Sequence, residues 1–138
     1  EEKTEKIIPG IQYVKLQITH SENFQSKRYV HHFILQVGNE EEKITTNVKN
    51  LVAIYIHSVR SIYGSENQNI LMHTSQPNSD SCGIICCLFS VLQHMDETDK
   101  FDVDSSLKHI QHTSGFKLDT FEKFKFLYDG GSQYIKSY

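Results

Sequence analysis

One segment of the sequence combines residue types that can do chemistry, because it sets a thiol between a polar loop and an apolar run. Residues 76–81 read Q-P-N-S-D-S, Cys82 and Gly83 follow, and the residues from Ile84 to Phe89 are apolar. This change of character predicts a buried helix that begins at about Cys82. The unpaired N–H groups and the dipole at a helix N-terminus favour a thiolate over a thiol. Cys82 is therefore the leading candidate for a nucleophile.

The residues around Cys82 suit such a role. The same N–H groups can hold an oxyanion, and the amide of Gln76 can point at it if the loop folds back. Gly83 has no side chain, which leaves room for a substrate backbone beside the sulfur. The polar residues just before the thiol can cap the helix, and they are Ser79, Asp80 and Ser81.

The other cysteines favour packing over chemistry. Cys86 and Cys87 lie one turn further along the predicted helix, where small apolar side chains belong in the core. With Cys82 they make an odd number of thiols, which is a poor disulfide framework. Their C-x-x-x-C-C spacing also differs from that of the usual zinc ligands. We therefore expect free thiols, no metal and no cofactor.

The elements that position these residues follow from the hydrophobic periodicity. Strands alternate apolar and polar residues, whereas helices repeat apolar residues every three to four positions. We expect strands at Ile11–Thr19, Tyr29–Val37, Lys43–Val48 and Asn69–His73, and helices from Asn50 to about Gly64, from Cys82 to about Met95, from Asp104 or Ser105 to His112, and from Thr120 to Tyr128, the last ended by Gly130-Gly131. The sum is an α+β fold, with a small mixed or antiparallel sheet packed around a buried helix. At 138 residues, we expect a single domain over residues 1–138.

Bulk properties exclude some partners. The net charge of −3 provides no basic surface for nucleic acid. The longest apolar stretches, 51–56 and 84–89, are much shorter than the roughly 20 residues that a membrane helix needs, so no membrane contact is expected. Free thiols and a charged N-terminus favour a cytoplasmic or nuclear location.

The run Q-P-N-S-D-S-C-G, followed by the apolar helix, resembles the nucleophile segment of the ubiquitin-like protease clan of cysteine peptidases. That clan includes SUMO proteases and adenovirus-type endopeptidases, and the latter also share the P-N-S run and the Cys-Cys pair. The resemblance implies a papain-like fold with Cys82 as nucleophile and Gln76 as oxyanion donor. It covers about residues 29–95.

The same resemblance implies a general base and a third catalytic residue. His32, followed by Phe33, stands where the clan places a His and an aromatic residue at the head of a strand. His31 is the rival, because it points to the opposite face of that strand. Asn47 lies near the position of the clan's acid and can orient an imidazole. It can equally be a turn residue or a helix cap.

These residues predict a thiol peptidase or isopeptidase that cleaves a ubiquitin-like modifier or a Gly-Gly-type site, with the modifier or its conjugates as partner. For a viral or effector protein the location would be the host cytosol. The first alternative is an acetyltransferase of the same clan. The second is an inactive pseudo-protease that binds a ubiquitin-like modifier, since the acid is replaced by Asn47.

Overall fold

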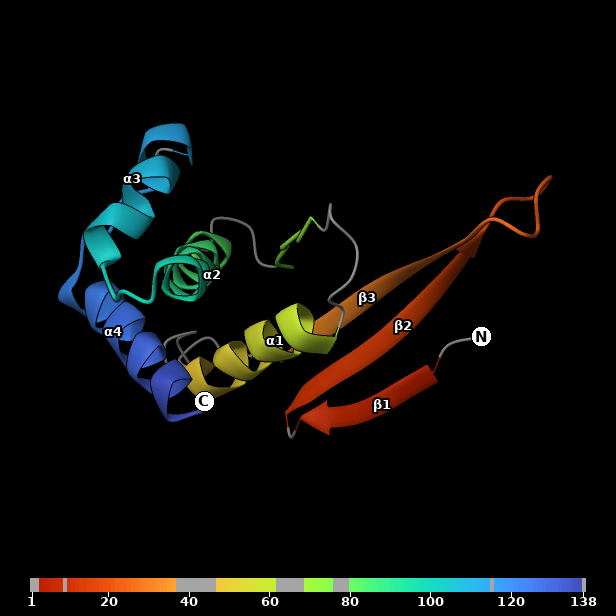
Figure 1. Ribbon diagram of the computed structural model, residues 1–138, viewed down its shortest axis with the longest axis horizontal. Helices are drawn as coiled ribbons and strands as arrows, with labels where there is room; N and C mark the ends of the chain where they lie inside the picture. Colours follow the sequence, from red (N-terminus) through yellow and green to blue (C-terminus); the bar gives the residue numbers. More distant parts are fainter. Residues whose placement is uncertain are drawn as a thin grey trace. The chain divides into compact units, whose positions relative to one another are not determined.

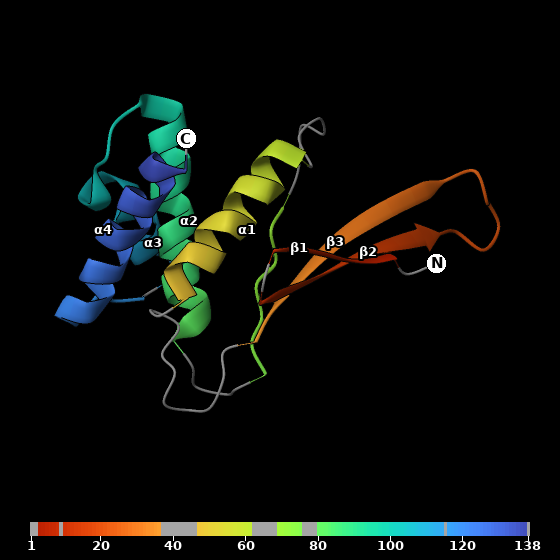
Figure 2. The same cartoon turned by 90° about the horizontal axis from the view of Figure 1, so that it is seen from below.

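The computed structural model describes residues 3–8, 10–36, 47–61, 69–75, 80–114 and 116–137. The chain divides into two compact units, Glu1–Glu42 and Lys43–Tyr138. Within the described residues, the strands lie in the first unit and the helices lie in the second, as Figures 1 and 2 show. The predicted α+β class is confirmed.

The first unit is an antiparallel sheet with the strand order β1-β2-β3. Its strands are β1 (Lys3–Ile8), β2 (Ile11–Thr19) and β3 (Lys27–Leu35). The turn between β1 and β2 contains Gly10 at a φ of 85°, a left-handed conformation that glycine adopts without strain. The sequence correctly predicted the positions of β2 and β3, but it missed β1 because charged residues interrupt the alternation there.

The register of the sheet fixes which side chains share a face. Tyr13 pairs with Phe33, and their rings lie 5.0 Å apart between centroids. The hydroxyl of Tyr13 also lies 2.6 Å from Nδ1 of His31. Because neighbouring residues of a strand point to opposite faces, His32 belongs to the other face of β3. The sequence made the same distinction between the two histidines.

The second unit consists of the helices α1 (Val48–Ser61), α2 (Ser81–Thr98), α3 (Val103–Ser114) and α4 (Phe121–Lys136). Helix α2 packs against α3 and α4, and α1 packs against α4. Their shared core contains fully buried side chains from all four helices: Val52, Cys87, Leu88, Val91, Leu92, Leu107, Phe126 and Leu127. The periodicity correctly predicted all four helices. None of the helices in the described part of the chain is long and apolar enough to cross a membrane.

The predicted end of the last helix at Gly130-Gly131 is wrong, because α4 continues to Lys136. Both glycines are buried, and they allow close approach of neighbouring side chains. A Cβ on Gly130 would lie 2.3 Å from Cδ1 of Leu88, and one on Gly131 would lie 2.3 Å from Cε2 of Phe101. These glycines are therefore packing positions and not a helix stop.

Two further strands were predicted in the second unit, and the structure tests only one of them fully. The strand expected at Asn69–His73 is wrong, since the structure assigns no strand to those residues. Leu71 is largely exposed there, whereas Met72 is half-buried. The strand expected at Lys43–Val48 lies mostly outside the described residues, and its last residue already begins α1. Gly64, the expected stop of the first helix, is also outside them.

Candidate active site

The thiol of Cys82 lies in the first turn of α2, as the sequence predicted. Asp80 is the N-cap residue, and the first bond of the helix runs from the N–H of Ile84 to the carbonyl of Asp80 at 3.1 Å. The backbone amides of the first turn therefore have no acceptor within the helix. Cys82 is half-buried, so its sulfur combines partial access to solvent with the positive end of the helix dipole.

The space beside Gly83 is occupied by an aromatic ring. A Cβ at this position would lie 2.5 Å from Cδ2 of Phe116, which shows how closely the ring approaches the backbone. From the sequence, we predicted that a substrate backbone would occupy this space. In the structure, the ring of Phe116 occupies it. The ring thus packs next to the residue that follows the thiol.

A cation is held at the same end of α2. The ammonium group of Lys123 donates to Oδ2 of Asp80 at 3.1 Å and to Oδ1 of Asp119 at 2.7 Å. It also lies 5.4 Å from the centroid of the Phe116 ring. Asp80 makes no side-chain cap bond to the helix, so its carboxylate binds Lys123 instead.

These contacts shift the pKa values of Asp119 and Lys123. The hydrogen bond from Lys123 lowers the pKa of Asp119. The hydrogen bonds to Asp119 and Asp80 raise the pKa of Lys123 in turn. Lys123 therefore stays a cation across the physiological range. Sequence reasoning missed this residue, although the i, i+4 spacing of Asp119 and Lys123 is a signal for an ion pair at the start of a helix.

The other two thiols are poorer nucleophiles than a thiol at the helix tip. Burial is the main cause that raises the pKa of Cys86, and it raises that of Cys87 to about 11. Cys87 is fully buried, as predicted for a core residue. Cys86 is half-buried, and its sulfur lies 3.6 Å from Sδ of Met72. Cys82 thus remains the best candidate for a nucleophile.

The other predicted site residues are dispersed over the elements of the chain. His32 lies on β3 in the first unit, and Asn47 directly precedes α1 in the second. Gln76 lies outside the described residues. The roles assigned to His32, Asn47 and Gln76 beside Cys82 therefore stay predictions.

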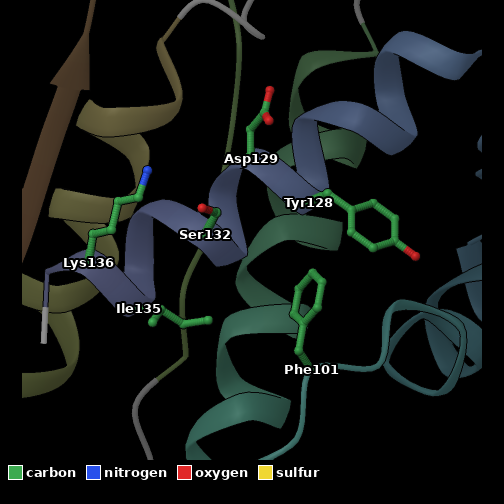
Figure 3. Close-up of a pocket in the computed structure, with 6 residues that line it drawn as sticks. All are labelled: Phe101, Tyr128, Asp129, Ser132, Ile135 and Lys136. Atoms are coloured by element: carbon green, nitrogen blue, oxygen red, sulfur yellow. The ribbon is translucent and has the colours of Figure 1, made fainter.

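A hollow of about 450 Å³ lies elsewhere in the second unit, as Figure 3 shows. Phe101 and Tyr128 line it with an edge-on ring contact of 5.2 Å between centroids. Its remaining lining residues are Asp129, Ser132, Ile135 and Lys136. Asp129 accepts a hydrogen bond from Lys125, and the lining contains no thiol or histidine. This hollow is therefore a poorer candidate for an active site than the start of α2.

Within the part of the chain that the structure describes, no three His, Cys, Asp or Glu side chains gather into a metal-binding group. The arrangement at the start of α2 instead offers a thiol, helix N–H groups, an ammonium group and an aromatic ring. Such a set fits an anionic ester that carries a ring, because the N–H groups and the ammonium attract the anion.

Comparison with known proteins overturns the predicted family. The model of the family described as protein-tyrosine phosphatase matches residues 2–132, whereas no curated protein matches the chain. The predicted membership of the ubiquitin-like protease clan is therefore wrong, since that resemblance covered about residues 29–95 and the phosphatase match covers residues 2–132. The cysteine peptidase activity and its SUMO and deubiquitinase specificities are wrong with it.

The two alternatives, the acetyltransferase and the modifier-binding pseudo-protease, are contradicted by the same match. The ubiquitin-like partner was inferred from the clan, and it stays a prediction. Only the broad class of hydrolase is compatible with both families. Because the matched residues 2–132 span nearly all 138 residues, the chain belongs to the protein-tyrosine phosphatase family.

Proposed function

We propose that this protein hydrolyses phosphotyrosine, with Cys82 as the nucleophile and Lys123 as the cation that holds the phosphate. One observation carries the proposal: the half-buried thiol and the anchored ammonium group lie at the same end of α2. The family match supports the substrate class. The ring of Phe116, next to Gly83, provides an apolar surface for the ring of the substrate.

The chemistry proceeds in two displacements. The phosphoryl group carries nearly two negative charges, and the amides of the first turn of α2 hold its oxygens. The sulfur of Cys82 attacks phosphorus, so that an S–P bond forms while the P–O bond to tyrosine breaks and the phenolate takes a proton from water. A water molecule then attacks phosphorus and breaks the S–P bond. Inorganic phosphate leaves, and the thiolate is restored.

The source of the cation is unusual for phosphate recognition. Residues 61–99 contain no Lys or Arg, although Arg is the residue best suited to bind phosphate. The positive charge must therefore come from another element, and Lys123 on α4 supplies it. Because Asp80 and Asp119 both bind Lys123, a phosphate has to replace at least one of these carboxylates.

This competition favours a second candidate function, which is binding of phosphotyrosine without hydrolysis. The carboxylate of Asp80 lies at the N-cap of the helix that carries the thiol. A negative charge there opposes the approach of a phosphate. A domain with this arrangement can retain the ligand preference of its family and lose turnover.

A phosphate-release assay on a phosphotyrosine peptide separates the two functions. For a phosphatase, we expect the parent protein to release phosphate. The rate of release should fall by more than about 100-fold in Cys82→Ser, because the variant lacks the thiolate that attacks phosphorus. Rapid acid quench of the parent should trap phosphate on Cys82. Equal release by parent and Cys82→Ser would refute the role of the thiol.

The lysine is tested with a matched pair on α4. Lys123→Met should raise KM by at least about 10-fold with a smaller change in kcat, because it removes a contact to the bound phosphate. Lys125→Met should leave KM unchanged, since Lys125 pairs with Asp129. If the parent protein does not hydrolyse the peptide, the affinities of Lys123→Met and Lys125→Met for the labelled peptide test the binding function. Equal affinities would show that Lys123 does not bind the phosphate.

The catalytic roles that the sequence suggested for three other residues remain separate proposals. His32 as base, Asn47 as the residue that orients it, and Gln76 as oxyanion donor came from a family to which the chain does not belong. So did the papain-like packing of the sheet around the nucleophile helix. His32→Ala tests the first of them, and an unchanged rate of phosphate release would remove His32 from the mechanism.

A further inference from the structure

Three sulfur-bearing residues lie on or next to the first two turns of α2, and the proposed phosphatase reaction uses only one of them. Sγ of Cys86 lies 3.6 Å from Sδ of Met72, which belongs to the segment 69–75 before the helix. Cys82 precedes Cys86 by four residues on α2. All three side chains are half-buried, so they are shielded from bulk water and still accessible to a small ion.

The spacing of the two measured sulfurs suits a shared ion. A metal bound to each at about 2.3 Å, the length of a zinc–thiolate bond, would span a gap of 3.6 Å with an S–metal–S angle of roughly 100°. This angle is ordinary for a metal with three or four ligands. No rearrangement of Met72 or Cys86 is therefore needed to hold an ion between them.

The helix provides the third ligand. Side chains four residues apart share one face of a helix, with Cβ atoms about 5–6 Å apart, and they lean toward its N-terminus. Cys82 and Cys86 therefore lie on the same face of α2.

We propose that Cys82, Cys86 and Met72 bind one monovalent copper ion. Thiolate and thioether ligands select Cu(I) among the common metals, whereas zinc and iron sites draw on histidine, carboxylate or four thiolates. Binding forms three Cu–S bonds and releases the two thiol protons, so that the site carries a net charge of −1. The N-terminus of α2 stabilises a negative charge at this position.

The proposal is independent of the phosphatase reaction, although the two meet at Cys82. An ion bound to that sulfur removes its free electron pair, so copper and a phosphorylated substrate exclude each other. Because the ligands must lose protons, the affinity for Cu(I) should also fall as the pH is lowered.

The test is a titration of the reduced protein with Cu(I) under oxygen-free conditions, in competition with bicinchoninate. We expect one tightly bound ion per chain, and at least about 10-fold weaker binding in Cys86→Ser and in Met72→Leu. The chain provides matched controls, since it contains one other methionine and one other nearby cysteine. Met95→Leu and Cys87→Ala should bind like the parent.

Equal affinities of Met72→Leu and Met95→Leu would overturn the site, because the thioether would then play no part. Circular dichroism of each apo variant shows whether it is folded, and X-ray absorption of the parent complex gives a second readout. Three sulfur neighbours at about 2.3 Å would support the site, and two sulfurs or any nitrogen neighbour would refute it. Neither measurement requires phosphatase activity.

Discussion

The two ends of helix α2 are each joined to α4 through an aspartate, but the joints differ in kind. At the N-terminal end, Asp80 pairs with the ammonium of Lys123, and Asp80 is largely exposed. At the C-terminal end, Asp96 accepts a hydrogen bond from Tyr55 at 2.8 Å and another from Tyr134. Both phenols are buried, and their rings meet edge-on at 5.8 Å between centroids.

This difference means that α2 is held more firmly at its C-terminal end than at the end that carries Cys82. Exposed ion pairs contribute little to stability, whereas hydrogen bonds from buried phenols to a carboxylate contribute more. Breaking the contacts at the end that carries Cys82 therefore costs less free energy than breaking those at the other end. An active site has to exchange its own contacts for those of a substrate, and such sites form where few contacts are lost.

The largest effect is expected from Asp96→Ala at the stable end. Each buried phenol loses a charged acceptor, but Asp96 is itself exposed, so water replaces part of the lost interaction and the free energy of unfolding should fall by about 1–3 kcal/mol. Urea unfolding measures this change. Glu97→Ala is the matched control, because Glu97 makes an exposed hydrogen bond with Gln93 on the same helix. Equal losses in both variants would show that the phenols do not depend on Asp96.

The next largest effect is a fall in the free energy of unfolding at alkaline pH. Burial, together with the bond to Asp96, raises the pKa of Tyr55 far above its ordinary value of 10. The folded protein then keeps a proton that the unfolded chain loses. Stability from this group is complete below about pH 10 and falls above it by about 1.4 kcal/mol per pH unit.

Unfolding of Tyr55→Phe as a function of pH checks this sign. The variant should lose stability less steeply than the parent between pH 9.5 and about 11. Tyr128→Phe, at an exposed position, should retain the slope of the parent. The comparison of the two ends of α2 fails if Tyr55→Phe also retains that slope.

The sequence predicted the helices better than the ends and partners of the elements. Apolar residues at three-to-four spacing reveal a helix because one of its faces must be buried. Glycine is ambiguous, since it can end a helix or allow two elements to approach closely, and only the packing of Gly130 on Leu88 decides between them. The strand expected at Asn69–His73 shows the converse problem, because composition does not reveal whether a strand has a partner.

The sequence predicted the position of Cys82 at the start of α2 for a physical reason. A thiol at a helix N-terminus suits any reaction that needs a thiolate and a bound oxyanion, so the position of Cys82 was correct while the family was wrong. A motif of eight residues reports this local physics and not the substrate. Lys123 and Phe116 were missed because they reach the thiol segment only through the packing of the helical unit.

A moderate effect is expected from Gly83→Ala, at the end of α2 that carries Cys82. Alanine favours a helix by up to about 1 kcal/mol, but its Cβ would lie 2.5 Å from the Phe116 ring, and overpacking costs about 1–3 kcal/mol. We expect a net loss of about 1 kcal/mol. In the background of Phe116→Leu the same change should become neutral or stabilising, and an identical loss in both backgrounds would rule out the ring contact.

The smallest effect on stability is expected from Lys123→Ala, which removes both ion pairs at the start of α2. The melting temperature at pH 7 should fall by less than in Asp96→Ala, and added salt should reduce the difference from the parent further. Lys123 lowers the pKa of Asp119, so stability from this pair is complete above the ordinary carboxyl range near pH 4 and disappears as the pH falls through the lowered value. Melting curves of parent and variant should therefore converge in acid. A loss as large as that of Asp96→Ala would mean that the end of α2 that carries Cys82 is as firmly fixed as the other, and that a phosphate could not displace these carboxylates at low cost.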